Sequence, residues 1–278
     1  MAKDTKDFVE TNRQLWDGLV EAHAASDFYD VAGFKAGGCS LGALERREVG
    51  SVEGKRLLHL LCRFGLDSLS WARQGATVTG IDISDQAITL ARSLAQECGL
   101  AAQFHRGEVF ETPDLVGAAR YDVIYMSWGA VIWVSDFPRL ARMAADLLAP
   151  GGCFYAIDGH PLCLALDETW TPDKGAPRLI YDYQTDGRPA GYTWAPDYAA
   201  PEHTPEAARA YEWAHGLGRI VTSLVESGLT IEFLREHDVA GWRALDGLEP
   251  RDDGCYALPD GHSQVPLTFS VMARKPEL

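Results

Sequence analysis

The fold of this chain is decided by two consecutive segments, Arg56-Leu57-Leu58-His59-Leu60-Leu61-Cys62-Arg63-Phe64-Gly65 and Thr77-Val78-Thr79-Gly80-Ile81-Asp82-Ile83-Ser84. They predict a buried strand, a tight turn, a helix and a second buried strand that ends at an acid. In an open α/β sheet, ligands bind in the crevice beyond the carboxyl ends of the strands. Asp82 is therefore placed to accept two hydrogen bonds from a ribose diol.

The turn between these strands lacks the glycine pattern of a dinucleotide site. A dehydrogenase places G-x-G-x-x-G in this turn, so that a pyrophosphate can approach the backbone. The turn here, Leu61-Cys62-Arg63-Phe64-Gly65, contains one glycine. It predicts a nucleoside ligand without a pyrophosphate, for which S-adenosylmethionine is the foremost candidate.

The composition is that of an acidic globular protein. The 278 residues carry a net charge of −15 and are 46% hydrophobic. No cluster of Lys and Arg is present, which argues against nucleic acid and against an anionic membrane surface as partners. No apolar run approaches the length of a transmembrane helix, and the polar N-terminus lacks the apolar core of a secretion signal, so we expect a cytoplasmic protein.

The cysteines predict neither a metal site nor a disulfide. They form no C-x-x-C pair and match no zinc spacing with histidine. Several lie in apolar runs, as small buried side chains do. The six are Cys39, Cys62, Cys98, Cys153, Cys163 and Cys255.

Hydrophobic periodicity and turn signals predict an alternation of helices and strands. Helices are expected at 5–25, 40–49, 67–75, 84–98, 137–148 and 206–227. Strands are expected at 56–61, 77–82, 103–108, 121–128, 153–157, 230–236 and 267–274. The segment 161–205 is rich in Pro, Gly and aromatic residues, and we expect it to form a cap with short strands at 178–183 and 191–194.

This order resembles the class I S-adenosylmethionine-dependent methyltransferases, from about residue 52 to the C-terminus. A narrower likeness, to a bacterial small-molecule subfamily, rests on a set of short motifs. They are Asn12, Trp16-Asp17, His23, Ser26, Phe28-Tyr29-Asp30, Cys62-x-Phe64-Gly65, Trp71-Ala72-Arg73, His160-Pro161, Trp213-x-His215 and Pro266-Leu267-x-Phe269-Ser270.

The resemblance implies an α/β, Rossmann-like methyltransferase fold. Its seven-stranded sheet is mostly parallel, and the antiparallel last strand lies between the fifth and the sixth. We expect residues 1–50 to form an N-terminal helical lid. Residues 51–278 would form the methyltransferase domain, with the cap inserted after strand 5 at about 161–205.

One motif departs from the usual family pattern. Where the family has acid-x-Gly-x-Gly-x-Gly, this chain has His59, Leu61, Arg63 and Gly65. The cofactor still fits if Leu61 and Arg63 adopt the backbone angles that glycine relaxes.

Cofactor contacts are expected from the turn, the strand ends and the lid. Asp82 is assigned to the ribose, although an Asp there could also cap the next helix. Glu108 and Val109 are assigned to adenine, although Glu108 could be a solvated loop residue. The full predicted set is Trp16, His59, Cys62, Gly65, Asp82, Ile83, Glu108, Val109 and Ser127.

The candidate catalytic residues are Tyr29, Asp158 and His160. Tyr29 would lie on the lid, while Asp158 could orient His160 as a general base after the fifth strand. A satisfied structural histidine is the alternative for His160. The predicted acceptor-binding residues are Trp128, Trp133, Trp213, His215 and Tyr183, for some of which core packing is the alternative.

We therefore expect methyl transfer from S-adenosyl-L-methionine to a small, aromatic or heterocyclic metabolite, on N, O or C, in secondary metabolism. The protein would be a monomer or homodimer that needs no metal. A nucleotide-dependent oxidoreductase and a non-catalytic cofactor-sensing domain are the alternatives. The missing G-x-G-x-x-G argues against the first, and the polar residues at the active edge argue against the second.

Overall fold

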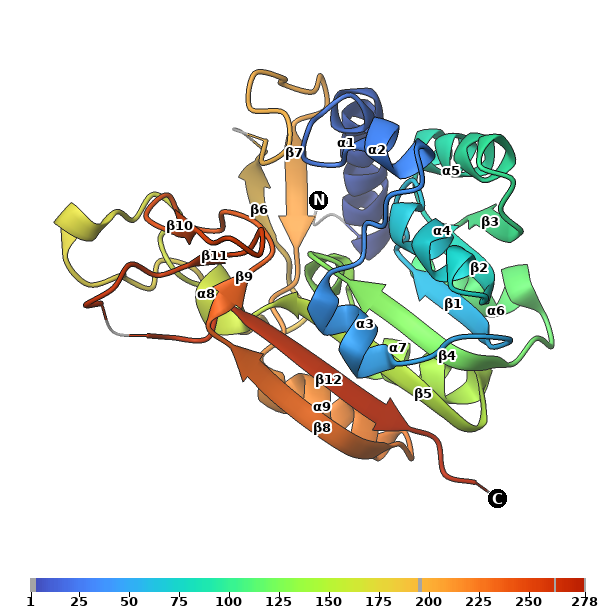
Figure 1. The fold of residues 1–278 in the computed structure, drawn as a ribbon. Coiled ribbons are helices and arrows are strands. Elements are labelled where there is room, and N and C mark those ends of the chain that lie inside the picture. The colour runs from blue at the N-terminus through green and yellow to red at the C-terminus, as the bar shows by residue number, and fades with distance from the viewer. Residues whose placement is uncertain (1–3, 195–196, 263, 278) are drawn as a thin grey trace.

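A seven-stranded sheet forms the centre of the computed structural model, which describes residues 4–194, 197–262 and 264–277 (Figure 1). Its order is β3 (Ala102–Arg106), β2 (Thr77–Asp82), β1 (Arg56–Leu60), β4 (Tyr121–Ser127), β5 (Leu148–Gly159), β12 (Thr268–Arg274) and β8 (Thr230–His237). The first five strands are parallel, and β12 is antiparallel to both its neighbours. The predicted fold class is confirmed, including the place of the last strand.

Helices cover both faces of this sheet. On one face, α7 (Phe137–Leu147) and α9 (Leu217–Glu226) pack against the strands in the largest apolar cluster. On the other face lie α3 (Ala43–Val49) and α4 (Leu66–Arg73), with α5 (Asp85–Glu97) beside α4. Burial on both sides explains why β1 and β4 read as continuous apolar runs instead of alternating ones.

The helix that follows β2 begins and ends where the sequence predicts. The hydroxyl of Ser84 accepts from the backbone N–H of Ala87 at 3.0 Å and so caps the start of α5. Gly99 has a φ of +64° and ends it. Because this cap is formed by Ser84, Asp82 is not needed for it.

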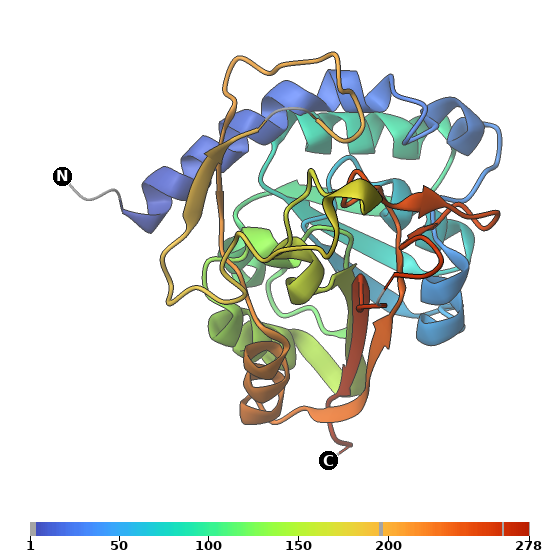
Figure 2. The same ribbon diagram turned by 90° about the vertical axis from the view of Figure 1, so that its left-hand side faces the viewer.

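The N-terminal segment forms α1 (Thr5–Ala24) and α2 (Val31–Lys35) outside the sheet. In Figures 1 and 2, α1 runs alongside α5 and past the strand β7 (Arg209–Glu212). Its apolar side is fully buried at Leu15 and Leu19. The helix predicted at 5–25 is confirmed.

The cap differs from the prediction in two places. The helix predicted at 206–227 is wrong, because its first part is β7, which pairs antiparallel with β6 (Ala190–Thr193). Only α9 is helical, and it begins after Gly216. The strand predicted at 178–183 is also absent, since this stretch forms only the isolated bridge Leu166–Leu179. Pairing between distant segments has overridden local helix propensity at β7.

A second part of the cap comes from a segment to which the sequence assigned no elements. Three short strands, β9 (Val239–Ala240), β11 (Tyr256–Ala257) and β10 (Glu249–Pro250), form a small sheet. It shares an apolar cluster with Cys163 and Trp170, which follow β5. The remaining short elements are η1 (Val109–Glu111), α6 (Thr112–Val116), η2 (Val131–Trp133), α8 (Pro161–Leu164) and η3 (Pro172–Lys174). Within the described ranges, no helix is both long enough and apolar enough to cross a membrane.

Candidate functional site

A cavity of about 1830 Å³ lies at the carboxyl edge of the sheet, lined also by residues of α1 and the cap. It brings together most of the residues that the sequence selected. Those lining it are Trp16, Tyr29, His59, Cys62, Gly65, Asp82, Ile83, Glu108, Val109, Ser127, Trp128, Trp133, Tyr183 and His215. The other three selected residues, Asp158, His160 and Trp213, do not line it.

The turn after β1 has the backbone shape that the family motif requires. Leu61 and Arg63 both have a φ of +55°, in the left-handed region that non-glycine residues rarely enter. Each such residue costs of order 1–3 kcal/mol and persists only where its surroundings enforce it. Gly65, at +80°, has a different reason to lack a side chain, because its Cβ would lie 2.8 Å from the ring of Phe104. The glycine is therefore needed for packing against the core.

Asp82 ends β2 at the wall of the cavity. Its Oδ2 accepts from the backbone N–H of Arg63 at 2.7 Å, and its Oδ1 accepts from that of Ser84 at 2.9 Å. Burial raises the pKa of this carboxyl, while these two N–H donors oppose the rise. Each oxygen keeps further acceptor capacity, so a diol in the cavity could still be bound.

His59 occupies the place of the acid in the usual motif. Its Nδ1 lies 2.8 Å from the hydroxyl of Ser68, and burial lowers its pKa to about 3. The imidazole is therefore neutral at physiological pH. Near it, the hydroxyl of Ser127 donates to Asp67 at 3.1 Å, and burial raises the pKa of Asp67. Burial likewise raises the pKa of the Cys62 thiol.

Glu108 follows β3 and starts η1. Its Oε2 accepts from the backbone N–H of Phe110 at 2.8 Å, and burial raises its pKa. The side chain thus has a structural contact at a cavity wall, which leaves open the adenine role predicted for it.

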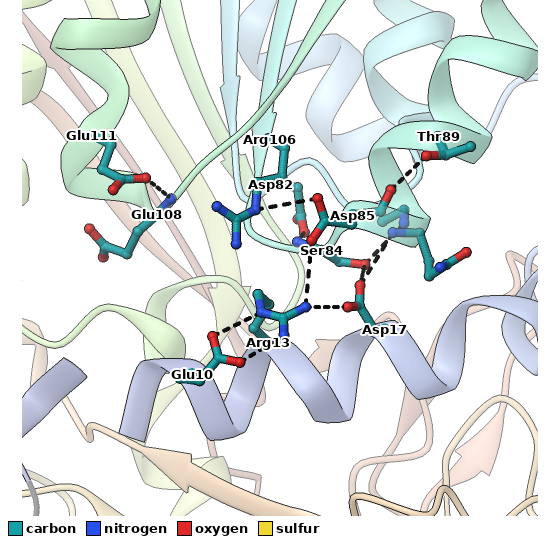
Figure 3. Close-up of polar contacts among 12 residues, drawn as sticks. Glu10, Arg13, Asp17, Asp82, Ser84, Asp85, Thr89, Arg106, Glu108 and Glu111 are labelled. Carbon is teal, nitrogen blue, oxygen red and sulfur yellow. Dashed lines mark hydrogen bonds and ion pairs between the residues drawn. The ribbon is translucent and has the colours of Figure 1, made fainter. Parts of the chain in front are cut away.

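Charged residues fasten α1 to the start of α5 (Figure 3). Arg13 pairs with Glu10 and Asp17 of its own helix, and lies 3.5 Å from Asp85 of α5. Asp17 accepts from the hydroxyl of Ser84 at 2.6 Å. The helix α1 is therefore anchored at Ser84, which follows Asp82 by two residues in the sequence.

A second set of contacts fastens α1 to the cap. The amide of Asn12 forms two hydrogen bonds with the backbone of Tyr211, of 2.7 and 2.9 Å. Near the other end of the helix, Nε2 of His23 lies 2.8 Å from Asp197, which also accepts from the indole N–H of Trp194. Lid and cap are thus joined near the middle of α1, at Asn12, and near its C-terminal end, at His23.

Tyr29 follows the lid helix and faces the turn after β1. Its hydroxyl contacts the hydroxyl of Tyr198 and the guanidinium of Arg63. Burial, followed by the neighbouring Tyr198, raises the pKa of Tyr29 well above its usual range. The phenol therefore stays protonated, which suits a hydrogen-bond donor better than a base.

The predicted pair of Asp158 and His160 does not form. Asp158 is 1% exposed and accepts from the backbone N–H groups of Gly129, Gly159 and Val131 at 2.6 to 2.8 Å. The prediction that it orients His160 is therefore wrong, since its oxygens hold the loop after β4.

Both ring nitrogens of His160 are in use. Nδ1 accepts from the backbone N–H of Leu162 at 3.0 Å and so caps α8, while Nε2 lies 2.9 Å from Glu236. The satisfied structural histidine, which the sequence left open as the alternative, matches this arrangement.

Trp213 and His215 lie in the extended segment between β7 and α9, not on a helix. Trp213 is 1% exposed and belongs to the packed interior, so the prediction that it binds the acceptor is wrong. His215 lines the cavity, and its Nε2 lies 2.7 Å from the carbonyl of Val134. Burial lowers the pKa of His215, so this ring is neutral at physiological pH.

Three tryptophans from lid, sheet edge and cap form what we term the tryptophan chamber: Trp16, Trp133 and Trp194. Their ring centroids lie 5.2 to 5.8 Å apart. Tyr192 stacks on Trp194 at 6.2 Å. Trp128 stands apart from this group, with a φ of +44° and an edge contact to Trp242.

A half-buried carboxyl lies at the wall of the chamber. Glu212 of β7 accepts from the hydroxyl of Tyr192, and both side chains line the cavity. Burial raises the pKa of Glu212 to about 7, against the opposing effect of Tyr192. The next residue bonds through its backbone N–H to the carbonyl of Ile132, which sets Glu212 beside η2. A carboxyl with this pKa can exchange a proton near neutral pH.

The sequence missed several polar residues of the cavity for different reasons. Glu212 could not be found, because its segment was predicted as helix. Arg63 offered a signal, a charge where the family motif has glycine. Glu45, whose pKa burial and Asp67 raise to about 8, offered none. Among the described residues, no three His, Cys, Asp or Glu side chains converge as a metal site would require.

Comparison with known proteins agrees with this geometry. A family model described as a methyltransferase domain matches residues 57–152. A ubiquinone biosynthesis O-methyltransferase of Methylobacterium nodulans is 35% identical over 38% of this chain and 41% of its own length. One from Escherichia coli O7:K1 is 28% identical over 54% of this chain and 63% of its own. The chain thus spans less than two thirds of these curated relatives.

A solved structure shares the fold. The S-adenosylmethionine-dependent methyltransferase from Mesorhizobium loti has a TM-score of 0.56 and 21% identity, and the match covers 83% of this chain and 95% of that one. At this identity the likeness extends to the fold alone.

Proposed function

We propose that this chain, which belongs to the class I S-adenosylmethionine-dependent methyltransferases, transfers a methyl group to a small aromatic acceptor. One observation carries the proposal: a single cavity joins the carboxylate that ends β2 to an aromatic chamber that contains the half-buried carboxyl of Glu212. When bound, S-adenosyl-L-methionine supplies an electrophilic methyl group on a sulfonium centre. Holding both reactants in one enclosure can lower the barrier by up to ~7–11 kcal/mol.

Several residues at the predicted positions support binding of this cofactor. Asp82 would accept from the ribose hydroxyls, since its oxygens are oriented by two backbone N–H groups and line the cavity. Glu108 and Val109 would contact adenine at the end of β3. The left-handed turn at Leu61 and Arg63 would support the amino-acid part, near Ser127 at the end of β4.

The acceptor would bind in the tryptophan chamber. Ligand sites are rich in aromatic side chains with a few polar groups, and three indole rings and Tyr192 meet that description here. With α1 fastened over this space, the lid would exclude water from the reacting atoms. A role for Trp128 and Tyr183 at the entrance stays a prediction.

Glu212 is the group we assign to proton removal, in place of His160. A phenolic hydroxyl or a ring N–H in the chamber would lose its proton to a carboxylate oxygen of Glu212, while Tyr192 holds that carboxylate in place. The O-methyltransferase names of the relatives favour a hydroxyl acceptor. Secondary metabolism, a cytoplasmic location and the monomer or homodimer state stay predictions.

Calorimetry tests the cofactor directly. The protein should bind S-adenosylhomocysteine and should not bind NADH under the same conditions. Incubation of a metabolite pool with deuteromethyl cofactor, followed by mass spectrometry, should then reveal a labelled aromatic product. Binding of NADH instead would favour the oxidoreductase, and binding of S-adenosylhomocysteine without any labelled product would favour the sensing domain.

Replacing Asp82 by Ala is expected to weaken S-adenosylhomocysteine binding at least about tenfold. Hydrogen bonds to a charged group contribute about 1.5–3 kcal/mol each, and the ribose would lose two. The change also leaves the N–H groups of Arg63 and Ser84 without their acceptor, so the melting temperature should fall while the circular dichroism spectrum stays the same. Asp114→Ala, which removes an exposed carboxylate of α6 that does not line the cavity, is the control. Unchanged affinity in Asp82→Ala would place the cofactor elsewhere.

A further inference from the structure

Arg63 is a cation in a costly backbone conformation: its charge helps to stabilise the Asp82 carboxylate, but no carboxylate among the described residues forms a salt bridge with it. Its backbone φ of +55° lies in the left-handed region, which glycine adopts freely. This position nevertheless holds an arginine, with a long and charged side chain. The guanidinium atoms Nε and Nη2 are buried and have no hydrogen-bond partner within the described part of the chain. A buried polar group without a partner costs about 1–3 kcal/mol, and more if it is charged.

The surroundings of this guanidinium are aromatic. Its central carbon lies 4.8 Å from the ring centroid of Trp16, 4.6 Å from that of Tyr29 and 5.2 Å from that of Phe64. Among the described residues, its Nη1 donates hydrogen bonds to the hydroxyls of Tyr29 and Tyr198. These rings hold the cation in place and do not neutralise it.

No ion pair with Arg63 occurs among the described residues, although the chain has 40 Asp and Glu. Arg13, on the lid nearby, pairs with three carboxylates. Arg63 is half-buried at the wall of the cavity and has no ion pair among the described residues, so its charge is free to pair with an anionic ligand there.

We propose that Arg63 binds the carboxylate of the cofactor's amino-acid part. The inference rests on the proposed function, because it takes the ligand of this cavity to be S-adenosylmethionine. The free Nε and Nη2 form one edge of the guanidinium, which is the edge that binds a carboxylate through two parallel hydrogen bonds. The backbone N–H of Arg63 also orients Asp82. Arg63 would therefore bind the amino-acid part of the cofactor directly and would help to bind the ribose through Asp82.

Two ligands that differ in the amino-acid part provide the test. S-adenosylhomocysteine has the carboxylate, whereas 5′-methylthioadenosine has the same adenosine and sulfur without it. In calorimetry, Arg63→Gln should weaken binding of S-adenosylhomocysteine at least about tenfold, the loss expected for a charge-assisted pair. Binding of 5′-methylthioadenosine should change less than about threefold.

A second variant and a control keep the result interpretable. Arg63→Gly restores the usual residue of the family turn and relieves the strained backbone, so it should fold at least as well and lose the same preference for S-adenosylhomocysteine. Arg73→Gln is the matched control, because Arg73 also stacks on an aromatic ring, 3.9 Å from that of Phe34, but lies outside the cavity. It should leave both affinities unchanged.

Three results would overturn the assignment. Equal losses for the two ligands would mean that Arg63 only shapes the cavity. An unchanged affinity for S-adenosylhomocysteine with a raised KM for the acceptor would mean that Arg63 binds a carboxylate of the acceptor instead. If the unaltered protein bound neither ligand, the proposed function itself would fail, and the inference with it.

Discussion

Replacing Glu212 by Gln is expected to lower turnover by about 10²–10⁴, the usual contribution of a positioned proton acceptor. The amide keeps the size of the side chain and can still accept a hydrogen bond from Tyr192, but it cannot take up a proton. Cofactor affinity should stay within about threefold, because Glu212 lies on β7, away from the turn and strand ends assigned to the nucleoside.

The pH dependence gives a second readout of the same variant. Only the deprotonated form of Glu212 can accept a proton, and its pKa is raised to about 7 by burial. Turnover of the unaltered protein should therefore rise with pH through about 7 and level off above it. This rise of turnover with pH, the pH limb, should disappear in Glu212→Gln.

Glu168→Gln is the matched control, since Glu168 lines the same cavity and accepts from Tyr181 at 2.9 Å. It should retain the limb and most of the turnover. His160→Ala should also stay within a few-fold, because both nitrogens of His160 have structural partners. A pH limb that persisted in Glu212→Gln on the same acceptor would assign it to the substrate or to another residue.

Deleting residues 1–30 is expected to abolish methyl transfer and to leave the sheet folded. The deletion removes Trp16 from the chamber and Tyr29 from the guanidinium of Arg63, and it opens the cavity to water. Two of the apolar clusters on the faces of the sheet contain no residue from this segment, and the third, around α4 and α5, contains only Val20 and Tyr29 from it, so most of the packing against the sheet does not depend on the lid.

Circular dichroism and calorimetry would accompany the activity assay. The truncated protein should unfold cooperatively and should bind S-adenosylhomocysteine more weakly. Asn12→Ala, which removes only the two hydrogen bonds to β7, should have an intermediate effect, and Lys6→Ala, at the exposed start of α1, should have none. Full activity of the truncated protein would show that the lid takes no part in transfer.

The sheet could be predicted from the sequence because its signals are local. The strand β1, the turn and β2 follow one another, and burial on both faces gives each strand its own apolar run. The cap could not be predicted in the same way. The strand β7 exists because β6 and Asn12 of α1 bond to it, and both lie far from it in the sequence.

The residues of the candidate site show the same difference between local signals and contacts with distant segments. Asp82 could be placed at the cavity because its position follows from the end of a strand. Asp158 also follows from a strand end, but the bonds of its carboxyl to the loop after β4 depend on how that loop folds back. Glu212 could be placed at the cavity only if its segment were correctly assigned as a strand of the cap. Residues on the sheet could thus be located from the sequence, whereas their partners from other segments could not.

The position of β12 determines the order in which the sheet can be completed. Of the strands described, β8 pairs only with β12 in this sheet, and β12 lies between β8 and β5. During synthesis, β8 emerges well before β12, and its edge stays unpaired until the last strand arrives. We therefore expect the five parallel strands to fold first and the far edge of the sheet to assemble late, with β8 exposed to aggregation in the interval.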